Sequence, residues 1–143
     1  MKIKTSFLLI FFPVLLFGQR KADDILGVWL NEKKEEVVKI YKTEDEYFGK
    51  IIDIQGEHAP IKNTLKDSNN PKPELRARPL IGMPLLENLT FSNGEYGGGT
   101  AYNPRMGRYF DCKAWLISEK EMKIRGYWGF LFGTETWERV SNY

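Results

Sequence analysis

Cysteine and histidine are nearly absent from this chain, which has one of each, Cys112 and His58. A single cysteine cannot form an internal disulfide, and the count excludes a cysteine-rich zinc site. The acidic and amide cluster Asp67, Asn69 and Asn70 lacks the glycine and the closing glutamate of an EF-hand loop. We therefore expect neither a metal nor a cofactor.

Candidates for a nucleophile are equally few. Cys112 lies inside an expected strand, and His58 lies on a proline-flanked segment far away in the sequence. A Cys112–His58 dyad would require that segment to fold over the strand, and most buried lone cysteines only pack. We assign no catalytic residue. A proton-transfer enzyme that uses Asp67 or Asp111 with a tyrosine stays the least favoured alternative.

Long hydrophobic runs are also missing, apart from residues 7–17, which are too few to span a bilayer in a helix of roughly 20 residues. Lys2 and Lys4 precede this stretch, and Gly18 and Gln19 follow it, which is the pattern of a secretory signal peptide. The alternative is a buried N-terminal helix. We expect residues 1–18 to be removed on export to the periplasm or the exterior, leaving residues 19–143 as one domain without an integral membrane segment.

An excess of charge of either sign is absent from the expected mature chain. Removing residues 1–18 takes away two lysines and no acid, so that 19 basic residues balance 19 acidic ones. Nucleic-acid binding depends on surplus lysine and arginine that face phosphates, and a polybasic membrane contact has the same requirement. The balance argues against both classes of partner.

No segment sustains a helical apolar period for three turns, and short alternating runs rich in β-branched and aromatic residues are present instead. Turn signals such as Asn93-Gly94 separate them. The pattern predicts eight strands, at residues 25–30, 35–42, 47–55, 85–91, 95–102, 108–117, 121–128 and 131–140. Short turns make neighbouring strands antiparallel, and Gly97-Gly98-Gly99 indicates a bulge.

Eight sequential antiparallel strands favour an all-β, up-and-down barrel over a sandwich, because closure removes both sheet edges. Residues 56–79, with four prolines, predict a long irregular connection between the third and fourth strands. Such a barrel either is filled by its own side chains or encloses one small ligand. An interior void of roughly 300 Å³ or more, lined by aromatic residues, would favour binding.

Two features resemble the lipocalin and calycin group. Gly27-Val28-Trp29 matches that group's Gly-x-Trp signature, and Trp137-Glu138-Arg139 lies where those proteins carry an arginine that packs over the tryptophan. An arginine over an indole contributes roughly 0.5–2 kcal/mol. We therefore expect Gly27, Trp29, Trp137 and Arg139 to close the barrel.

A longer ordered set of motifs covers almost the whole expected mature chain. It includes Gly49-Lys50-Ile51, Arg76-x-Arg78-Pro79-Leu80-x-Gly82, Tyr102-Asn103-Pro104-x-x-Gly107 and Arg125-Gly126-Tyr127. Together with the closure residues, this set resembles the bacterial exported family known as domain of unknown function 2147. The resemblance implies a lipocalin-like barrel, and no settled activity comes with it. Ala101 departs slightly from the usual hydrophobic residue before the tyrosine.

The segment 67–82 contains the first group of candidate ligand-binding residues. Arg76 and Arg78 share a face of an extended backbone, where guanidiniums could hold a carboxylate or phosphate. The alternative is that Arg78 pairs with Asp67 and folds the segment down as a plug. We place Arg78, Asp67 and Asn70 among the candidates.

The second group comes from the later strands. Arg125 could await an anionic ligand, pair with Asp111 in the core, or point outward. Aromatic residues, among them Tyr102, Tyr109 and Trp128, could line an apolar pocket or fill the barrel. The predicted function is an exported protein that binds an apolar or amphipathic molecule with an anionic group. The alternative is a structural or interaction protein of the cell envelope, with a filled barrel and a protein partner.

Overall fold

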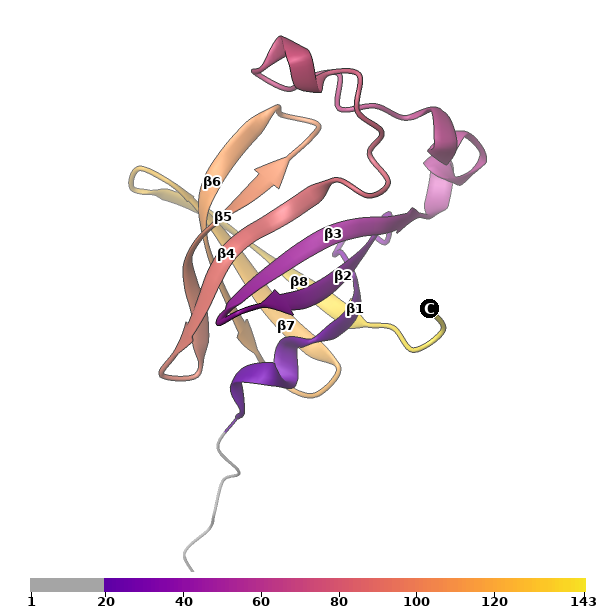
Figure 1. Cartoon of the computed structure of the whole chain (residues 1–143). Helices are drawn as coiled ribbons and strands as arrows, with labels where there is room; N and C mark the ends of the chain where they lie inside the picture. Colours follow the sequence, from indigo (N-terminus) through magenta and orange to yellow (C-terminus); the bar gives the residue numbers. More distant parts are fainter. Residues whose placement is uncertain (1–19) are drawn as a thin grey trace, which may run out of the picture.

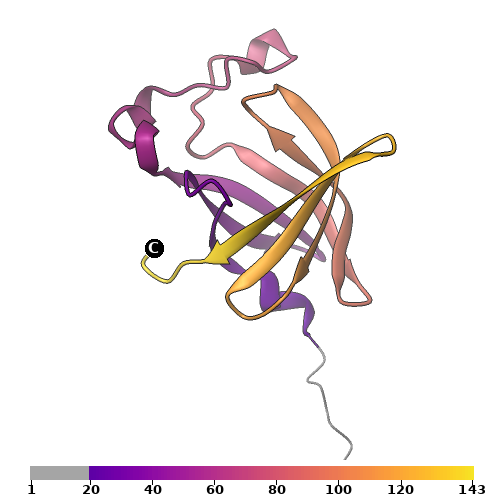
Figure 2. The same cartoon turned by 180° about the vertical axis from the view of Figure 1, so that it is seen from behind.

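A computed structural model describes residues 20–143, which form one closed barrel of eight antiparallel strands in sequential order (Figures 1 and 2). The strands are β1 (Gly27–Leu30), β2 (Glu36–Thr43), β3 (Glu46–Ile54), β4 (Pro84–Ser92), β5 (Glu95–Asn103), β6 (Arg108–Leu116), β7 (Glu121–Trp128) and β8 (Leu131–Arg139). The predicted all-β up-and-down barrel is confirmed. The expected signal peptide, residues 1–18, lies outside the described residues.

Buried apolar and exposed polar side chains alternate along the strands, so that one face of the sheet forms the interior and the other faces solvent. In β2, Val38 and Ile40 are buried while Lys39 between them is exposed. The eight predicted strands agree with the observed ones to within about two residues at each end. Residue 25 is the exception that matters, because it was expected to begin the first strand and instead ends a helix.

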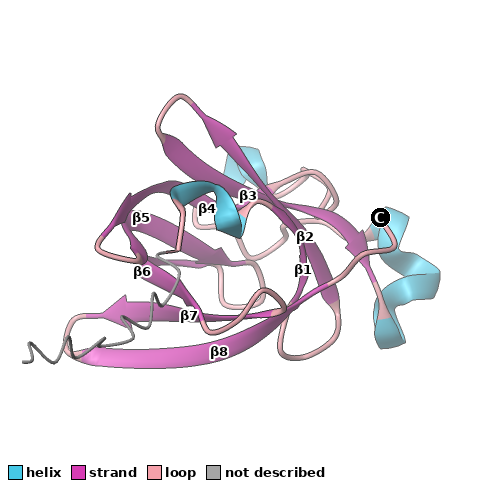
Figure 3. Ribbon diagram, turned by 90° about the horizontal axis from the view of Figure 1, so that it is seen from below, coloured by secondary structure: helices cyan, strands magenta, loops and turns pink. Residues whose placement is uncertain are grey.

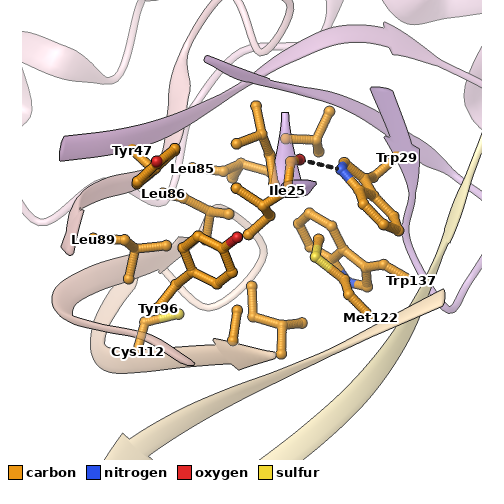
Figure 4. Packing of buried hydrophobic residues seen from close by; sticks show 14 of the residues in the cluster. Ile25, Trp29, Tyr47, Leu85, Leu86, Leu89, Tyr96, Cys112, Met122 and Trp137 are labelled. Carbon is orange, nitrogen blue, oxygen red and sulfur yellow. Dashed lines mark hydrogen bonds between the residues drawn. The ribbon is translucent and has the colours of Figure 1, made fainter. Parts of the chain in front are cut away.

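That helix, η1 (Ala22–Ile25), is a single 3-10 turn that seals one end of the barrel (Figure 3). Ile25 is fully buried, and its carbonyl accepts a hydrogen bond of 2.9 Å from the Trp29 indole (Figure 4). The Tyr96 hydroxyl donates to the Ala22 carbonyl at 2.7 Å, and Tyr47 donates to the Asp23 carboxylate at 2.6 Å. Hydrogen bonds from three buried aromatic side chains, Trp29, Tyr47 and Tyr96, therefore fix η1 in place. We call this the sealed end.

The barrel closes where β1 meets β8, with Trp29 paired to Arg139. The Arg139 guanidinium lies 4.3 Å from the centroid of the Trp29 ring and donates to the Leu26 carbonyl at 2.6 Å and to the Asp24 carbonyl at 2.5 Å. A Cβ atom at Gly27 would lie 2.5 Å from this guanidinium, and the φ of +135° at this position also favours glycine. The seam joins stacking, hydrogen bonding and close packing in one place.

The sheet bends where three glycines interrupt β5. The register between β5 and β6 shifts between Tyr96 and Gly99, and Gly98 has a φ of +73°. A Cβ atom at Gly99 would lie 2.2 Å from the Glu87 carbonyl oxygen of β4. Glycine is therefore required for the close approach of β4 to β5 at this bulge.

The connection between β3 and β4 is more regular than the proline content predicted. It contains two 3-10 helices, η2 (Gly56–Thr64) and η3 (Pro73–Leu75), and an isolated bridge between Lys66 and Pro79. Figure 1 shows it arching outside the barrel at the end opposite η1. Short 3-10 turns tolerate proline because the ring fixes φ in the helical range.

None of the helices found in residues 20–143 has the length and apolar character needed to cross a membrane.

Candidate functional site

A cavity of about 300 Å³ opens at the end of the barrel opposite η1. Three parts of the chain surround it: the β1–β2 turn, the β5–β6 turn, and the inner faces of β4 to β8. Its lining residues are Asn31, Lys33, Glu35, Glu36, Leu85, Leu86, Ala101, Tyr102, Asn103, Pro104, Arg105, Phe110, Ile124, Gly126, Gly133, Thr134, Glu135 and Trp137. We call this the open end.

The inner part of the cavity is apolar. Leu86, Ile124 and Trp137 also belong to the hydrophobic core, so the floor of the cavity is the top of the packed interior. Gly126 and Gly133 pair across β7 and β8 and bring no side chain into the space. A Cβ atom at Gly133 would meet nothing within 4 Å. These two glycines therefore help to keep the cavity empty.

Glu36 carries the deepest charge at the mouth of the cavity. Its carboxylate accepts a hydrogen bond of 3.2 Å from the Asn31 amide, and no ion pair to it occurs within residues 20–143. Burial raises the pKa of Glu36 above its ordinary value, Arg105 opposes this, and Glu135 and Glu35 add to it.

The other charged residues at the mouth are two acids and two cations. Glu135 accepts a hydrogen bond of 2.9 Å from the Trp137 indole. Arg105 forms an ion pair with Glu35, so its charge is already compensated. Lys33 is exposed. The mouth thus combines three carboxylates with two cations, one of which is held by a carboxylate.

The predicted residues Asp67, Asn70, Arg78 and Tyr102 are brought together, and they contact one another. Asp67 is fully buried, and its carboxylate accepts hydrogen bonds from Tyr102 at 2.6 Å, from Asn70 at 2.7 Å and from Arg78 Nε at 3.0 Å. Arg78 Nη2 lies 2.9 Å from the same carboxylate. Burial, followed by the Asp67 hydrogen bond, raises the pKa of Tyr102. Of the two alternatives for Arg78, the ion pair with Asp67 is the one observed.

This Asp67 cluster lies beside the cavity and contributes one residue to its lining. Of its four members only Tyr102 lines the space, and the Tyr102 hydroxyl is engaged by Asp67. Next to the cluster, the Asn69 amide donates to the Arg105 carbonyl at 2.9 Å, and a Cβ atom at Gly107 would lie 1.8 Å from the Asn69 carbonyl oxygen. The β3–β4 connection therefore holds the β5–β6 turn, which forms one wall of the cavity.

Arg125 and the remaining predicted aromatics lie away from the cavity. Arg125 donates to the Thr134 hydroxyl at 2.7 Å and stacks 4.5 Å from the Phe132 ring, and no ion pair with Asp111 occurs in the described part of the chain. Tyr109 packs against Tyr102 with ring centroids 4.6 Å apart, and Trp128 is 56% exposed. Of the alternatives for Arg125, the outward one is observed.

Cys112 is buried in the barrel, where burial raises the pKa of its thiol to about 12. His58 lies on η2, outside the barrel, and no hydrogen bond joins the two among residues 20–143. Within the same residues, no group of three or more His, Cys, Asp or Glu side chains is placed to hold a metal ion.

Sequence reasoning missed Glu36 and Glu135, although a signal for both was present. Glu36 shares the inward alternation of Val38 and Ile40, and Glu135 shares that of Trp137. A charged residue in register with core positions near a strand end indicates a polar group at a barrel mouth.

Comparison with known proteins decides the family. The model of the family described as "Uncharacterized protein conserved in bacteria (DUF2147)" matches residues 27–139, which run from the glycine of the seam to its arginine. This chain belongs to the DUF2147 family. For this DUF2147 protein, the family resemblance predicted from its motifs is confirmed.

A solved structure shares the fold of this DUF2147 protein. It is described as a Helicobacter pylori protein, HP1028, that belongs to the lipocalin family. The match has a TM-score of 0.70 and 25% identity and covers 82% of this chain and 84% of that one. The fold is therefore lipocalin-like, and such barrels suggest small-ligand binding in general.

A curated sequence relative matches over a shorter stretch. It is the chromosomal replication initiator protein DnaA of Pseudothermotoga lettingae, which is 44% identical over 66 residues. These residues make up 46% of this chain and 14% of that protein, so the chain spans only a small part of the relative's length.

Proposed function

We propose that this protein is exported and binds one small molecule with an apolar body at the open end of the barrel. The observation that most supports this proposal is the cavity of about 300 Å³, whose floor is apolar and whose mouth is polar. Ligand sites combine these two features, with apolar walls for affinity and a few polar groups for orientation. Export rests on the signal-like residues 1–18.

The polar end of the ligand follows from the charges that line the mouth. The expectation of an anionic group rested on Arg78 and Arg125, and neither lines the cavity. Glu36 and Glu135 do line it, and the Arg105 charge is already held by Glu35. A carboxylate pair favours a cation or a hydrogen-bond donor over another anion. We therefore assign the ligand an amphipathic structure whose polar end is an amine or another donor.

The Asp67 cluster supports a binding role over catalysis. A carboxylate that already accepts from Tyr102, Asn70 and Arg78 has its oxygens occupied, so it is poorly placed to take a proton from a substrate. Its role in this proposal is to hold the β3–β4 connection against the β5–β6 turn. In this proposal the ligand binds in the cavity and not at the Asp67 cluster.

Filling the cavity tests the proposal. In Gly133→Phe, the ring should occupy space that the glycine leaves open, so the affinity for a neutral apolar dye such as N-phenyl-1-naphthylamine should fall about ten-fold or more. Gly97→Phe is the matched control, because Gly97 also has open space around it and does not line the cavity. Fluorescence titration measures both. Equal dye binding by the wild type and Gly133→Phe would overturn the proposal.

A second titration tests the polar end separately. Dodecylamine and dodecanoate carry similar chains with opposite charges, and each can be used to displace the dye. We expect the amine to compete more strongly at pH 7, and Glu36→Gln combined with Glu135→Gln to remove that preference. Preferred displacement by dodecanoate would refute the assigned charge while leaving the apolar site intact.

A further inference from the structure

The β7–β8 hairpin carries four exposed large apolar side chains, among them the two most exposed of the described residues. Phe130 is 93% exposed, Phe132 60%, Trp128 56% and Leu131 55%. Single exposed apolar residues are ordinary on protein surfaces, but four within five positions are not. We call residues 127–132 the hairpin tip.

The shape of the tip distinguishes it from a flat docking face. Trp128 pairs with Leu131 and Tyr127 pairs with Phe132, so successive pairs present apolar side chains to opposite faces of the hairpin. Gly129, with a φ of +61°, makes the tight turn that pushes Phe130 outward. A flat protein partner would cover one face of such a tip, whereas the interfacial layer of a bilayer surrounds it on all sides.

Two arginines stack on aromatic rings of the tip. Arg108 stacks 4.1 Å from the Trp128 ring, and Arg125 stacks 4.5 Å from the Phe132 ring. Residues 122–134 contain two cations and no acid, and the acid nearest in register is Asp111, which pairs with Tyr127 across β6 and β7. Aromatic side chains flanked by arginines match the apolar boundary and the anionic headgroups of a lipid surface.

We propose that the hairpin tip docks this protein on the surface of a bilayer that contains anionic lipid. Phe130, Leu131 and their aromatic neighbours enter the acyl boundary, and Arg108 and Arg125 lie at the headgroups. Because Gly126 and Gly133 of the same strands line the cavity, docking brings the cavity mouth close to the lipid. The inference stands on the exposed tip and two local arginines, so it needs no basic excess over the whole chain. It does not depend on what the cavity binds.

Flotation of the full protein with lipid vesicles tests this proposal. We expect binding to vesicles of equal parts phosphatidylglycerol and phosphatidylcholine, with a blue shift of tryptophan emission. Phe130→Ser combined with Leu131→Ser should lower the partition coefficient at least about ten-fold. The matched control is Ile61→Ser combined with Ile117→Ser, because these residues are 49% and 48% exposed elsewhere on the surface. This control should bind as the wild type does.

The arginines make a separate contribution that the same assay measures. Arg108→Gln and Arg125→Gln should each weaken binding to the anionic vesicles about five-fold, with little effect on vesicles of phosphatidylcholine alone. A wild type that stays in solution with anionic vesicles overturns the proposal, as does equal loss in the Ile61 and Ile117 control. Crosslinking that yields a Phe130-dependent protein adduct or dimer without vesicle binding assigns the tip to a protein partner instead.

Discussion

The two ends of this barrel use the same eight strands in opposite ways. At the sealed end, η1 buries Ile25 against Trp29 and Tyr96, and the Arg139 guanidinium covers the Trp29 ring. At the open end, the strands continue past the core with glycines and carboxylates, and a cavity remains. The difference teaches that an eight-stranded barrel can be solid at one end and hollow at the other.

The division assigns stability and binding to different residues. Ile25 and Trp29 at the sealed end have no exposed surface, so truncating either removes contacts on all sides. Side chains at the open end already face space, so their loss removes less packing. Substitutions matched between the two ends can therefore test the comparison directly.

The largest expected contrast is between two tryptophans. Trp29→Ala removes a fully buried ring and the platform under Arg139, and should lower the free energy of unfolding by about 3–5 kcal/mol. Trp128→Ala at the open end removes an exposed ring and one cation–π contact, and should cost no more than about 1 kcal/mol. Urea denaturation measures both. Similar losses for the two would end the distinction between the ends.

A smaller contrast uses two isoleucines. Ile25→Ala at the sealed end should cost about 2–5 kcal/mol, because the site is enclosed on all sides. Ile124→Ala should cost less, about 1–2 kcal/mol, since that side chain borders the cavity. Thermal and urea unfolding provide the measurement. An equal or greater cost for Ile124 would show that the open end is packed as tightly as the sealed one.

The smallest expected change in stability concerns Glu36, where the substitution should stabilise the protein. Burial raises the pKa of Glu36 in the folded protein above the 4.5 of an ordinary glutamate. As the pH rises from 4.5 through the folded pKa, the unfolded chain loses this proton first, so the free energy of unfolding falls. Glu36→Gln removes this decline and should be more stable than the wild type at pH 7.

Urea titrations at pH 4 and pH 7 measure the effect, and Glu74→Gln, at an exposed carboxyl, is the control. A Glu36→Gln variant that is less stable than the wild type at pH 7 would mean that the carboxylate supports the mouth of the cavity instead of straining it.

The sequence predicted the fold well because strand alternation and turn residues are local signals. Lys39 between Val38 and Ile40 marks a strand without knowledge of its partner, and Asn93-Gly94 marks a turn in the same way. The start of the barrel was harder to predict. Ile25 is a residue type common in strands, and only its burial in the barrel and the Tyr96 hydrogen bond to Ala22 make it the end of η1.

The cavity was harder still, because it depends on contacts between distant segments. Arg78 had the chemistry of an anion site, but Asp67, eleven positions away, occupies it. The residues next to an arginine in the sequence do not show whether it forms an ion pair in the folded protein. Glu36 and Glu135 come from opposite ends of the chain and share one mouth only after β8 has returned to β1.

The seam between the first and last strands also sets the order of folding. Arg139 donates to the Leu26 carbonyl across 113 positions of sequence, so this contact cannot form until nearly the whole chain has been delivered. Contacts of such long range are slow to form, and until then the margins of β1 and β7 stay unpaired. In the export that we propose, the chain would emerge as an incomplete sheet with unpaired edges, and the arrival of β8 would close the barrel.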